Sequence, residues 1–386
     1  MDWNKITVVE LANVLAGPSV GQWLAELGAT VIKVENLRTQ GDVTRSWRLP
    51  GETTESGISA YFSSVNWGKK SIALDLNQPA AQAIVQQLAA SADIVLASYL
   101  PGQAEKFQVD YATLSAQNPA LIWAEISGYG PDSSRPAFDA IIQAEAGYTY
   151  MNGSPGHISK MPVALVDVLA AHHLKEALLL ALLERQQSGQ GKRVHVSLLD
   201  AAMSSLVNQA SNWLVGGHVP QAVGSEHPNI VPYGTMFATR DGSPIVLAVG
   251  NDGQFRRLCD VLLVEVPNRL LRNAQRVALR EEVKTWLAPL IAQQDRATLL
   301  LQLEEARVPA GAVKTMPEVF DTPAAQRIML RDQGIEGIRQ HVSHGVDHTN
   351  SLTMPPALSQ QADEILKDLG YSLDQIAQLR KVGAVG

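Results

Sequence analysis

The chain has 386 residues, with 38 acidic and 31 basic side chains and a formal net charge of −7. This length predicts two or so domains with sizeable cores, and the acidic balance argues against a non-specific nucleic-acid binder. The N-terminus has no secretory signal pattern, and the longest apolar run, EALLLALLE, is far shorter than the roughly 20 residues that a membrane span needs. We therefore expect a cytoplasmic globular protein with neither nucleic-acid nor membrane partners.

The N-terminal part alternates strand-like and helix-like segments. Residues 6–10 (ITVVE) predict a strand, residues 16–29 predict a turn that opens into a helix, and residues 30–35 (TVIKVE) predict a second strand. Further strand-like runs follow at residues 69–76, 93–99 and 121–130. This alternation predicts an α/β fold, with an open, Rossmann-like parallel sheet and helices on both faces.

The first turn, AGPSVG, invites a comparison with dinucleotide-binding folds, because Glu35 ends the second strand where a ribose-binding acid would stand. The glycine spacing does not match G-x-G-x-x-G, and Pro18 lies where a phosphate-facing N–H would be needed. A classical NAD or ATP site is not expected.

Residues 162–191 predict one helix that stops at a glycine-containing segment, with a single carboxylate, Asp167, set between Val166 and Val168. Aspartate is a favoured helix cap. A cap usually lies at the polar edge of an apolar run, however, and an ionised group flanked by apolar residues is costly unless it has a partner. The residues alone leave capping and catalysis equally open for Asp167.

The second half of the chain predicts a smaller α+β domain and a helical tail. Residues 194–217 are expected to be helical for much of their length, and a Pro/Gly-rich connection follows. Residues 234–252 predict a β-hairpin turning at residues 240–242, and helical segments extend from Gln254 to Ala306. The tail predicts two short helices joined at Gly370.

The cysteine, serine and histidine residues give weaker indications of function. The only cysteine, Cys259, excludes an intrachain disulfide and is expected at a core helix position. No G-x-S-x-G motif is present, so a nucleophile is sought among the carboxylates. The adjacent His172 and His173 are interpreted as surface or packing residues. No metal site is expected at His341, His344 and His348, which lie in a polar segment without the H-E-x-x-H pattern.

Several stretches, in order along nearly the whole chain, carry a resemblance to a known family. They include VVELANVLAGPSVGQWLAELGATVIKVE, GDVTRSW, YFSSVNWGKKSIALDL, SYLPG, ISGYGP, FDAIIQAEAG, VDVLAA, GKRVHVSLLDA and PYGTMFATRDG. Together they resemble the class III CoA-transferases, the family of formyl-CoA transferase, to which α-methylacyl-CoA racemase is also similar. The resemblance implies an interlocked homodimer that takes coenzyme A and acyl-CoA as substrates and has no permanently bound cofactor.

The resemblance also implies a domain plan and site residues. The large α/β domain takes residues 1–205 and is completed by a return segment, 321–386; residues 206–230 form a linker and 231–320 the small α+β domain. Asp167 matches the catalytic aspartate of the family. The residues that match its CoA-binding positions, or that could supply cations there, are Val14, Leu15, Ala16, Arg38, Leu74, Ser98, Tyr99, Lys106 and Arg135. The acyl pocket is assigned Asn13, Phe138 and Asp139.

Some residues depart from the patterns of the relatives. Asn13 replaces a histidine, Leu15 replaces a glutamine and Asn36 replaces an arginine of formyl-CoA transferase, which argues against formate and oxalate as substrates. The implied function is transfer of CoA from an acyl-CoA to a small carboxylic acid, preferably a dicarboxylic acid, through an aspartyl anhydride and an aspartyl-CoA thioester. The alternatives are an acyl-CoA racemase or isomerase, whose histidine is replaced here by Phe138, and a non-catalytic CoA-binding protein.

Overall fold

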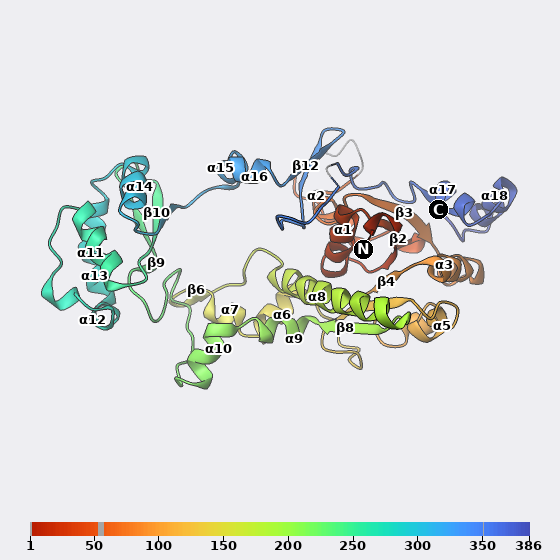
Figure 1. Cartoon of the computed structure of the whole chain (residues 1–386), viewed down its shortest axis with the longest axis horizontal. Helices are drawn as coiled ribbons and strands as arrows, with labels where there is room; N and C mark the ends of the chain where they lie inside the picture. The colour runs from red at the N-terminus through yellow and green to blue at the C-terminus, as the bar shows by residue number, and fades with distance from the viewer. Residues whose placement is uncertain (1, 53–57, 350) are drawn as a thin grey trace. The chain divides into compact units, whose positions relative to one another are not determined.

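The structure is a computed structural model that describes residues 2–52, 58–349 and 351–386 (Figure 1). The chain forms two compact units, each described here by itself. Unit 1 comprises Met1–Ala146, Met161–Val207 and Arg327–Gly386, and unit 2 comprises Gly147–Lys160 and Asn208–Gln326.

This division differs from the expected domain plan at three places, one of which is residues 321–326, expected in the return segment but belonging to unit 2. Residues 147–160, expected in the large domain, belong to unit 2, where the N–H of Gly224 donates to the carbonyl of Gly153 at 2.7 Å. The expected linker, residues 206–230, begins with the helix Val207–Leu214. Local sequence patterns could not show the placement of residues 147–160, because it depends on contacts between distant segments. The helix lies within residues 194–217, which were expected to be helical for much of their length.

Unit 1 is built around a parallel sheet. Among the described residues, the sheet has six strands in the order β3-β2-β1-β4-β5-β8, and every pair of neighbours is parallel. The strands are β1 (Thr7–Leu11), β2 (Thr30–Asn36), β3 (Lys69–Leu74), β4 (Ile94–Ala97), β5 (Ile122–Ser127) and β8 (Arg193–Ser197). The order runs outward from β1 in both directions, as in the doubly wound Rossmann arrangement.

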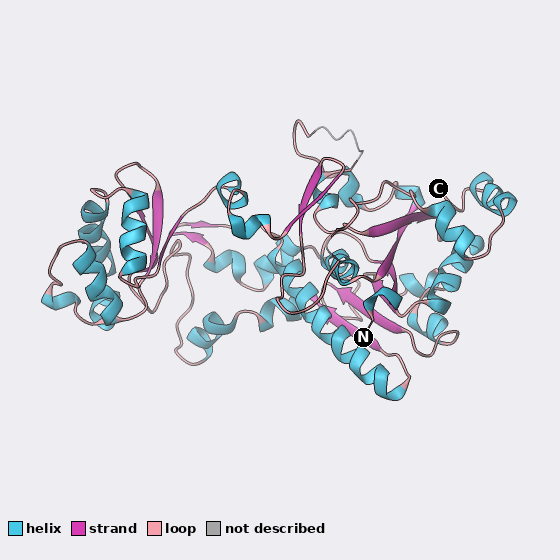
Figure 2. Cartoon of the chain, turned by 45° about the horizontal axis from the view of Figure 1, so that its top comes forward, coloured by secondary structure: helices cyan, strands magenta, loops and turns pink. Residues whose placement is uncertain are grey.

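Helices cover both faces of this sheet, as the alternating sequence predicts (Figures 1 and 2). Val8 and Val9 are adjacent in β1 and both fully buried, so apolar side chains point to both faces. The helices and short strands of unit 1 are α1 (Ala16–Leu27), α2 (Ala60–Ser63), α3 (Pro79–Ser91), α4 (Gln103–Lys106), α5 (Tyr111–Ser115), α6 (Asp139–Glu145), α8 (Leu165–Ser188), α9 (Leu198–Ser204), β12 (Met329–Asp332), β13 (Ile335–Ile338), α17 (Ala362–Asp368) and α18 (Leu373–Lys381).

Different helices cover the two faces of the unit 1 sheet. On one face, α3, α17 and α18 contribute buried side chains such as Ile84, Leu366 and Ile376 to a core shared with the strands. On the other, α1 and α8 pack against each other and against the sheet. The expected tail helices around Gly370 are confirmed as α17 and α18. Among the described residues, none of the helices combines the length and apolarity that a membrane crossing needs.

The expectation that residues 194–217 are helical for much of their length is confirmed by α9 (Leu198–Ser204) and by the helix Val207–Leu214, but the stretch begins in the strand β8. Its first residues pair with β5 and complete the sheet, with Arg193 opposite Trp123 and an Arg193–Glu125 ion pair at 2.7 Å. The helix α9 begins only at Leu198. The strand is short and lies at the sheet edge, where its sequence signal is weak and pairing with a distant strand decides its conformation.

Unit 2 has a three-stranded antiparallel sheet in the order β11-β10-β9, packed against helices. The expected hairpin is confirmed, because β9 and β10 are antiparallel and the N–H of Gly242 donates to the carbonyl of Thr239. Cys259 is fully buried on α11, as expected. The elements are α7 (Tyr148–Met151), β6 (Gly153–Ser154), β7 (His157–Ile158), α10 (Val207–Leu214), β9 (Tyr233–Ala238), β10 (Pro244–Ala248), α11 (Asp252–Val261), α12 (Asn273–Ala278), α13 (Arg280–Ile291), α14 (Arg296–Glu305), β11 (Ala310–Ala312), α15 (Met316–Phe320) and α16 (Pro323–Gln326).

Candidate active site

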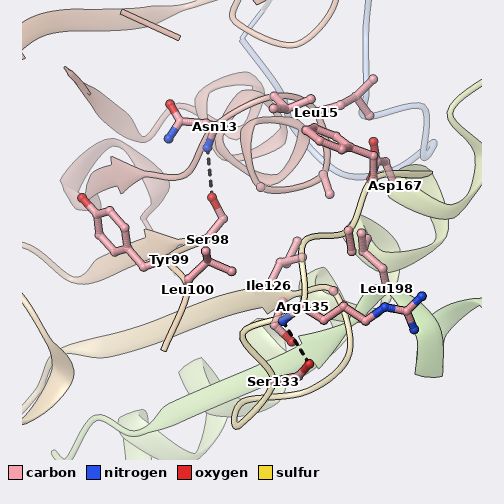
Figure 3. A pocket seen from close by; sticks show the side chains of 17 residues that line it. Asn13, Leu15, Ser98, Tyr99, Leu100, Ile126, Ser133, Arg135, Asp167 and Leu198 are labelled. Carbon is pink, nitrogen blue, oxygen red and sulfur yellow. Dashed lines mark hydrogen bonds between the residues drawn. The ribbon is translucent and has the colours of Figure 1, made fainter. Parts of the chain in front are cut away.

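A pocket lies where the strand order of the unit 1 sheet reverses. The chain leaves β1 toward Asn13 and leaves the neighbouring β4 toward Ser98, and the Asn13 N–H donates to the Ser98 hydroxyl at 3.2 Å (Figure 3). In open α/β sheets, ligands bind at the carboxyl ends of strands at this kind of reversal. The pocket has a volume of about 230 Å³ and is lined by Asn13, Val14, Leu15, Ala16, Gly17, Ser98, Tyr99, Leu100, Ile126, Ser127, Gly128, Ser133, Arg135, Ala137, Phe138, Asp167 and Leu198.

The pocket brings together most of the residues predicted from the sequence. Asn13, Val14, Leu15 and Ala16 lie on the connection from β1 to α1, and Ser98 and Tyr99 follow β4. Arg135 and Phe138 lie between β5 and α6, and Asp167 is in the first turn of α8. These segments are far apart in sequence and meet because parallel strands place their carboxyl ends at one edge.

Asp167 is not the cap of α8. The N-cap position is Ala164, which makes no side-chain capping bond, and Asp167 is the third residue of the helix. Instead, the Asp139 carboxylate accepts the N–H of Val166 at 2.9 Å. Asp139 therefore satisfies a free N–H at the start of α8 from a different helix, and the Asp167 carboxylate lines the pocket.

Gln143 holds Asp139 and the segment before α8 together. Its side-chain amide donates to the other Asp139 oxygen at 2.8 Å, and its amide oxygen accepts the N–H of Met161 at 2.8 Å. Gln143 is fully buried, and Asp139 has an exposed fraction of only 8%. Asp139, expected in the acyl pocket, is not among the residues that line it; its carboxylate instead binds the N–H of Val166 at the start of α8.

The surroundings of Asp167 make its ionisation costly. Burial raises the pKa of the Asp167 carboxyl from 3.8 to about 7, and the negative charge of Asp139 adds to this rise. The N-terminus of α8, where Asp167 lies in the first turn, favours the ionised carboxylate. Burial and the charge of Asp139 oppose this effect, so the Asp167 carboxyl is a weaker acid than an exposed aspartate.

Aromatic side chains close to Asp167 form a feature that the sequence analysis did not assign. The rings of Trp47 and Tyr61 meet edge to face at 5.0 Å, and Trp47 also lies 6.5 Å from the ring of Phe138. Burial raises the pKa of the Tyr61 phenol, and the charge of Asp167 raises it further. Both missed aromatics lie in stretches that carry the family resemblance, GDVTRSW and YFSSVNWGKK, and that was the available signal.

A second cavity of about 160 Å³ shares Asn13, Ser98 and Tyr99 with the first. Its other lining residues are Leu11, Val34, Glu35, Asn36, Leu76, Asn77, Gln103 and Phe107. The exposed Lys106 lies beside it, with its ammonium 5.7 Å from the centre of the Phe107 ring. The two cavities therefore form neighbouring compartments around the ends of β1 and β4.

The remaining predicted CoA-binding residues are placed differently. Leu74 is fully buried in the core and lines neither cavity. Arg38 is exposed on the 3-10 turn Leu37–Thr39 after β2. Arg135 lines the pocket while its guanidinium pairs with Glu145 and lies 4.3 Å from the Tyr129 ring centre. Any anion that Arg135 binds must therefore compete with Glu145.

The C-terminal histidines do not gather around a common point. His341 is largely buried, its N–H donates to Glu26 at 2.7 Å, and its ring centre lies 5.8 Å from that of His348. Within residues 2–52, 58–349 and 351–386, no three His, Cys, Asp or Glu side chains are arranged to hold a metal ion.

Comparisons with known proteins identify the family of the chain. The family model of CoA-transferase family III matches residues 4–368. The chain is 38% identical to succinate–glutarate CoA-transferase of Agrobacterium fabrum, covering 94% of each chain, and 31% identical to succinyl-CoA:mesaconate CoA-transferase of Haloarcula hispanica, covering 95% of this chain and 96% of the relative. A crystal structure of a CAIB/BAIF family protein from Brucella suis is 35% identical, has a TM-score of 0.84 and covers 94% of this chain and 98% of its own. The chain belongs to CoA-transferase family III, and the protein is a CoA-transferase.

Proposed function

We propose that this protein moves CoA from an acyl-CoA donor to a small dicarboxylic acid, with Asp167 as the covalent carrier. The proposal rests on the position of Asp167. Its carboxylate is buried and lines the pocket at the reversal of strand order, and Asp139 rather than Asp167 accepts the free N–H at the start of α8. A carboxylate kept out of water can attack an acyl-CoA carbonyl, and the resulting anhydride is sheltered from hydrolysis.

The reaction follows from the chemistry of a carboxylate nucleophile. The ionised Asp167 attacks the thioester carbonyl, the C–S bond breaks, and CoA leaves as a thiolate from a mixed anhydride. The thiolate then attacks the Asp167 carbonyl, releasing the donor acid and forming an aspartyl-CoA thioester. The acceptor carboxylate attacks this thioester to give a second anhydride, and the released thiolate takes the new acyl group. Asp167 is thereby regenerated.

The preference for dicarboxylic acids rests on the relatives and on the pocket. The two relatives described above are named for succinate with glutarate or mesaconate, all of which are dicarboxylic acids. The pocket combines one cation, Arg135, with polar groups of Asn13, Ser98 and Ser133. These groups can accommodate a second carboxylate that does not react.

A substrate screen tests the proposal directly. Each of several acyl-CoA donors is incubated with a panel of monocarboxylic and dicarboxylic acids, and the CoA thioesters are identified by mass spectrometry. Succinyl-CoA with a C4–C6 dicarboxylate is expected to give the highest kcat/KM. Faster transfer to monocarboxylic acids would contradict the dicarboxylate assignment, and no transfer with any pair would contradict the proposed function.

Phe138 predicts that the protein does not racemise its substrate. A racemase needs a group that moves the α-proton, and a phenyl ring cannot do so. Incubation with a 2-methylacyl-CoA in D2O is therefore expected to give negligible deuterium at the α-carbon. Rapid uptake, measured by mass spectrometry, would replace the transferase assignment by the isomerase alternative.

Lys106 is expected to contribute a local cation for the phosphates of CoA, because it lies beside the second cavity and the chain carries a net charge of −7. Lys106→Ala should weaken CoA binding by about 1 kcal/mol, the size of a solvent-exposed charge-assisted contact. Calorimetry at low salt measures this change. The matched control is Lys314→Ala, an exposed lysine of unit 2. Equal affinities of the two variants would assign Lys106 to the solvated surface.

We also propose that the protein is an interlocked homodimer. The helix α8 exposes Leu180 and Leu183 by 61% and 57%, and residues Leu214 and Val215, at the end of α10, are exposed by 78% and 88%. Apolar side chains at this exposure favour a protein partner. Light scattering should give twice the chain mass of 41.6 kDa. Two differently tagged dimers should exchange subunits only after unfolding; rapid exchange under native conditions would exclude interlocking.

A further inference from the structure

The loop that borders the pocket is held in a strained conformation. Val14, between β1 and α1, has a φ of +70°, in the left-handed region that a β-branched side chain rarely adopts. Such a residue costs of the order of 1–3 kcal/mol and persists only when its surroundings impose it. Val14 and the two residues after it line the pocket with Asp167. The groups that impose this conformation therefore also shape the site.

One set of contacts comes from a buried ion pair. The Lys33 ammonium donates to the carbonyl of Ala12 at 3.0 Å, and the N–H of Val14 donates to the Asp42 carboxylate at 3.0 Å. Lys33 and Asp42 are themselves 3.0 Å apart, and neither side chain is exposed. Asp42 is fixed in turn by the hydroxyl of Thr44, which donates to its second oxygen at 2.8 Å. The backbone on both sides of Asn13 is thus held by one ion pair.

A second lysine holds the first turn of α1, which directly follows the loop. The Lys69 ammonium donates to the carbonyl of Pro18 at 2.9 Å and to Asn66 at 2.9 Å. Glu10 connects the two lysines, with its carboxylate 3.0 Å from Lys33 and 2.7 Å from Lys69. All three of these charged side chains are fully buried. The loop and the first turn of α1 are thus held by one continuous network of charges.

The buried network is better suited to fixing the backbone conformation of the loop than to stabilising the fold. Burying ions costs several kcal/mol each, and replacing a buried ion pair by apolar residues is often neutral or stabilising. Charged groups nevertheless give short, directional bonds to backbone N–H and C=O groups that apolar side chains cannot make. Here those bonds end on the main chain of the pocket loop and not on a remote part of the core.

We propose that these residues, the buried charge cluster Glu10, Lys33, Asp42 and Lys69, are positioning residues that hold residues 12–18 in the strained conformation required to align the acyl-CoA with Asp167. The inference rests on the proposed function, because alignment matters only for a substrate that reacts at Asp167. None of the cluster touches the reacting atoms. The cluster acts through the backbone of the loop, and a shift of about 1 Å in such a loop can lower activity by about a hundredfold.

The test compares Asp42→Asn with a buried carboxylate that holds a different segment. Asp42→Asn removes the charge that pairs with Lys33 while preserving the shape of the side chain. It is expected to raise the KM for acyl-CoA and lower kcat, with a loss in kcat/KM of about tenfold or more. The control is Glu26→Gln on α1, because Glu26 is fully buried and accepts the N–H groups of Gln340 and His341, at 2.7 Å each. It should lower the melting temperature but leave kcat and KM near the wild-type values.

A crystal structure of Asp42→Asn gives a readout that does not need turnover. Val14 is expected to leave the φ of +70° seen here. If Asp42→Asn does not fold, Thr44→Val, which removes one bond to Asp42, replaces it and should show a smaller loss of kcat/KM. Wild-type kinetics with an unchanged Val14, or equal losses in Asp42→Asn and Glu26→Gln, would overturn the inference. A wild-type protein without transfer activity would instead contradict the proposed function, and the conformation of Val14 in Asp42→Asn would still decide whether the cluster holds the loop.

Discussion

Asp167→Asn is expected to abolish CoA transfer and at the same time make the folded protein more stable at about pH 8. An amide cannot form the anhydride, so the loss in kcat should reach about 10³-fold or more. The pKa of Asp167 in the folded protein, about 7, lies above the ordinary aspartate value of 3.8 that applies to the unfolded chain. Between these values the folded state binds more protons than the unfolded state, so the free energy of unfolding falls as the pH rises. Asparagine has no carboxyl to ionise, so the free energy of unfolding of Asp167→Asn should exceed that of the wild type by roughly 1–3 kcal/mol. Denaturant unfolding measures this difference.

The same variant separates a nucleophile from a helix cap. A cap lost at Asp167 would lower stability and leave turnover nearly unchanged. Because Asp139 provides the bond to the first turn of α8, CoA binding and folding should persist in Asp167→Asn. In the wild type, acyl-CoA followed by hydroxylamine or borohydride should modify one peptide, the one that contains Asp167. Wild-type turnover by the Asn variant, after deamidation is excluded by mass, would refute the covalent mechanism.

The rate of transfer is expected to depend steeply on pH below neutrality. In the proposed mechanism the nucleophile is the ionised form of Asp167, whose pKa is about 7, so kcat/KM should fall about tenfold for each pH unit below this value and level off above it. The rise in this pKa is caused first by burial and then by the charge of Asp139. Asp139→Asn removes the second cause and should move the inflection to lower pH, giving a larger fraction of plateau activity in acid.

The control for this shift is Asp260→Asn, an exposed carboxylate of unit 2. It should leave the inflection where it is in the wild type. Asp139→Asn also weakens the hydrogen bond with Gln143, so its kcat/KM on the pH plateau should be lower than that of the wild type. An inflection that stays near pH 7 in Asp139→Asn would show that burial alone sets the pKa of Asp167. A wild-type profile that is flat down to about pH 5 would contradict a raised pKa altogether.

The sequence by itself determined the elements whose signals are local. Residues 6–10 and 30–35 predict strands because they are rich in β-branched and apolar residues, and residues 16–29 predict a helix opened by a glycine-containing turn. The unit 2 hairpin was predictable in the same way, because its Asp-Gly turn is specified by neighbouring residues. Asp167 was identifiable as unusual, since a carboxylate between two valines needs a reason.

Only the tertiary structure decided what Asp167 does in the fold. The residue that caps α8, Asp139, lies on another helix, and no spacing rule relates it to Val166. The raised pKa arises from burial by segments that follow different strands. The strain at Val14 likewise depends on Asp42 and Lys33, whose side chains reach the loop from other elements. Propensity and periodicity act over a few residues, whereas desolvation and charge pairing are set by groups that meet only after the sheet has formed.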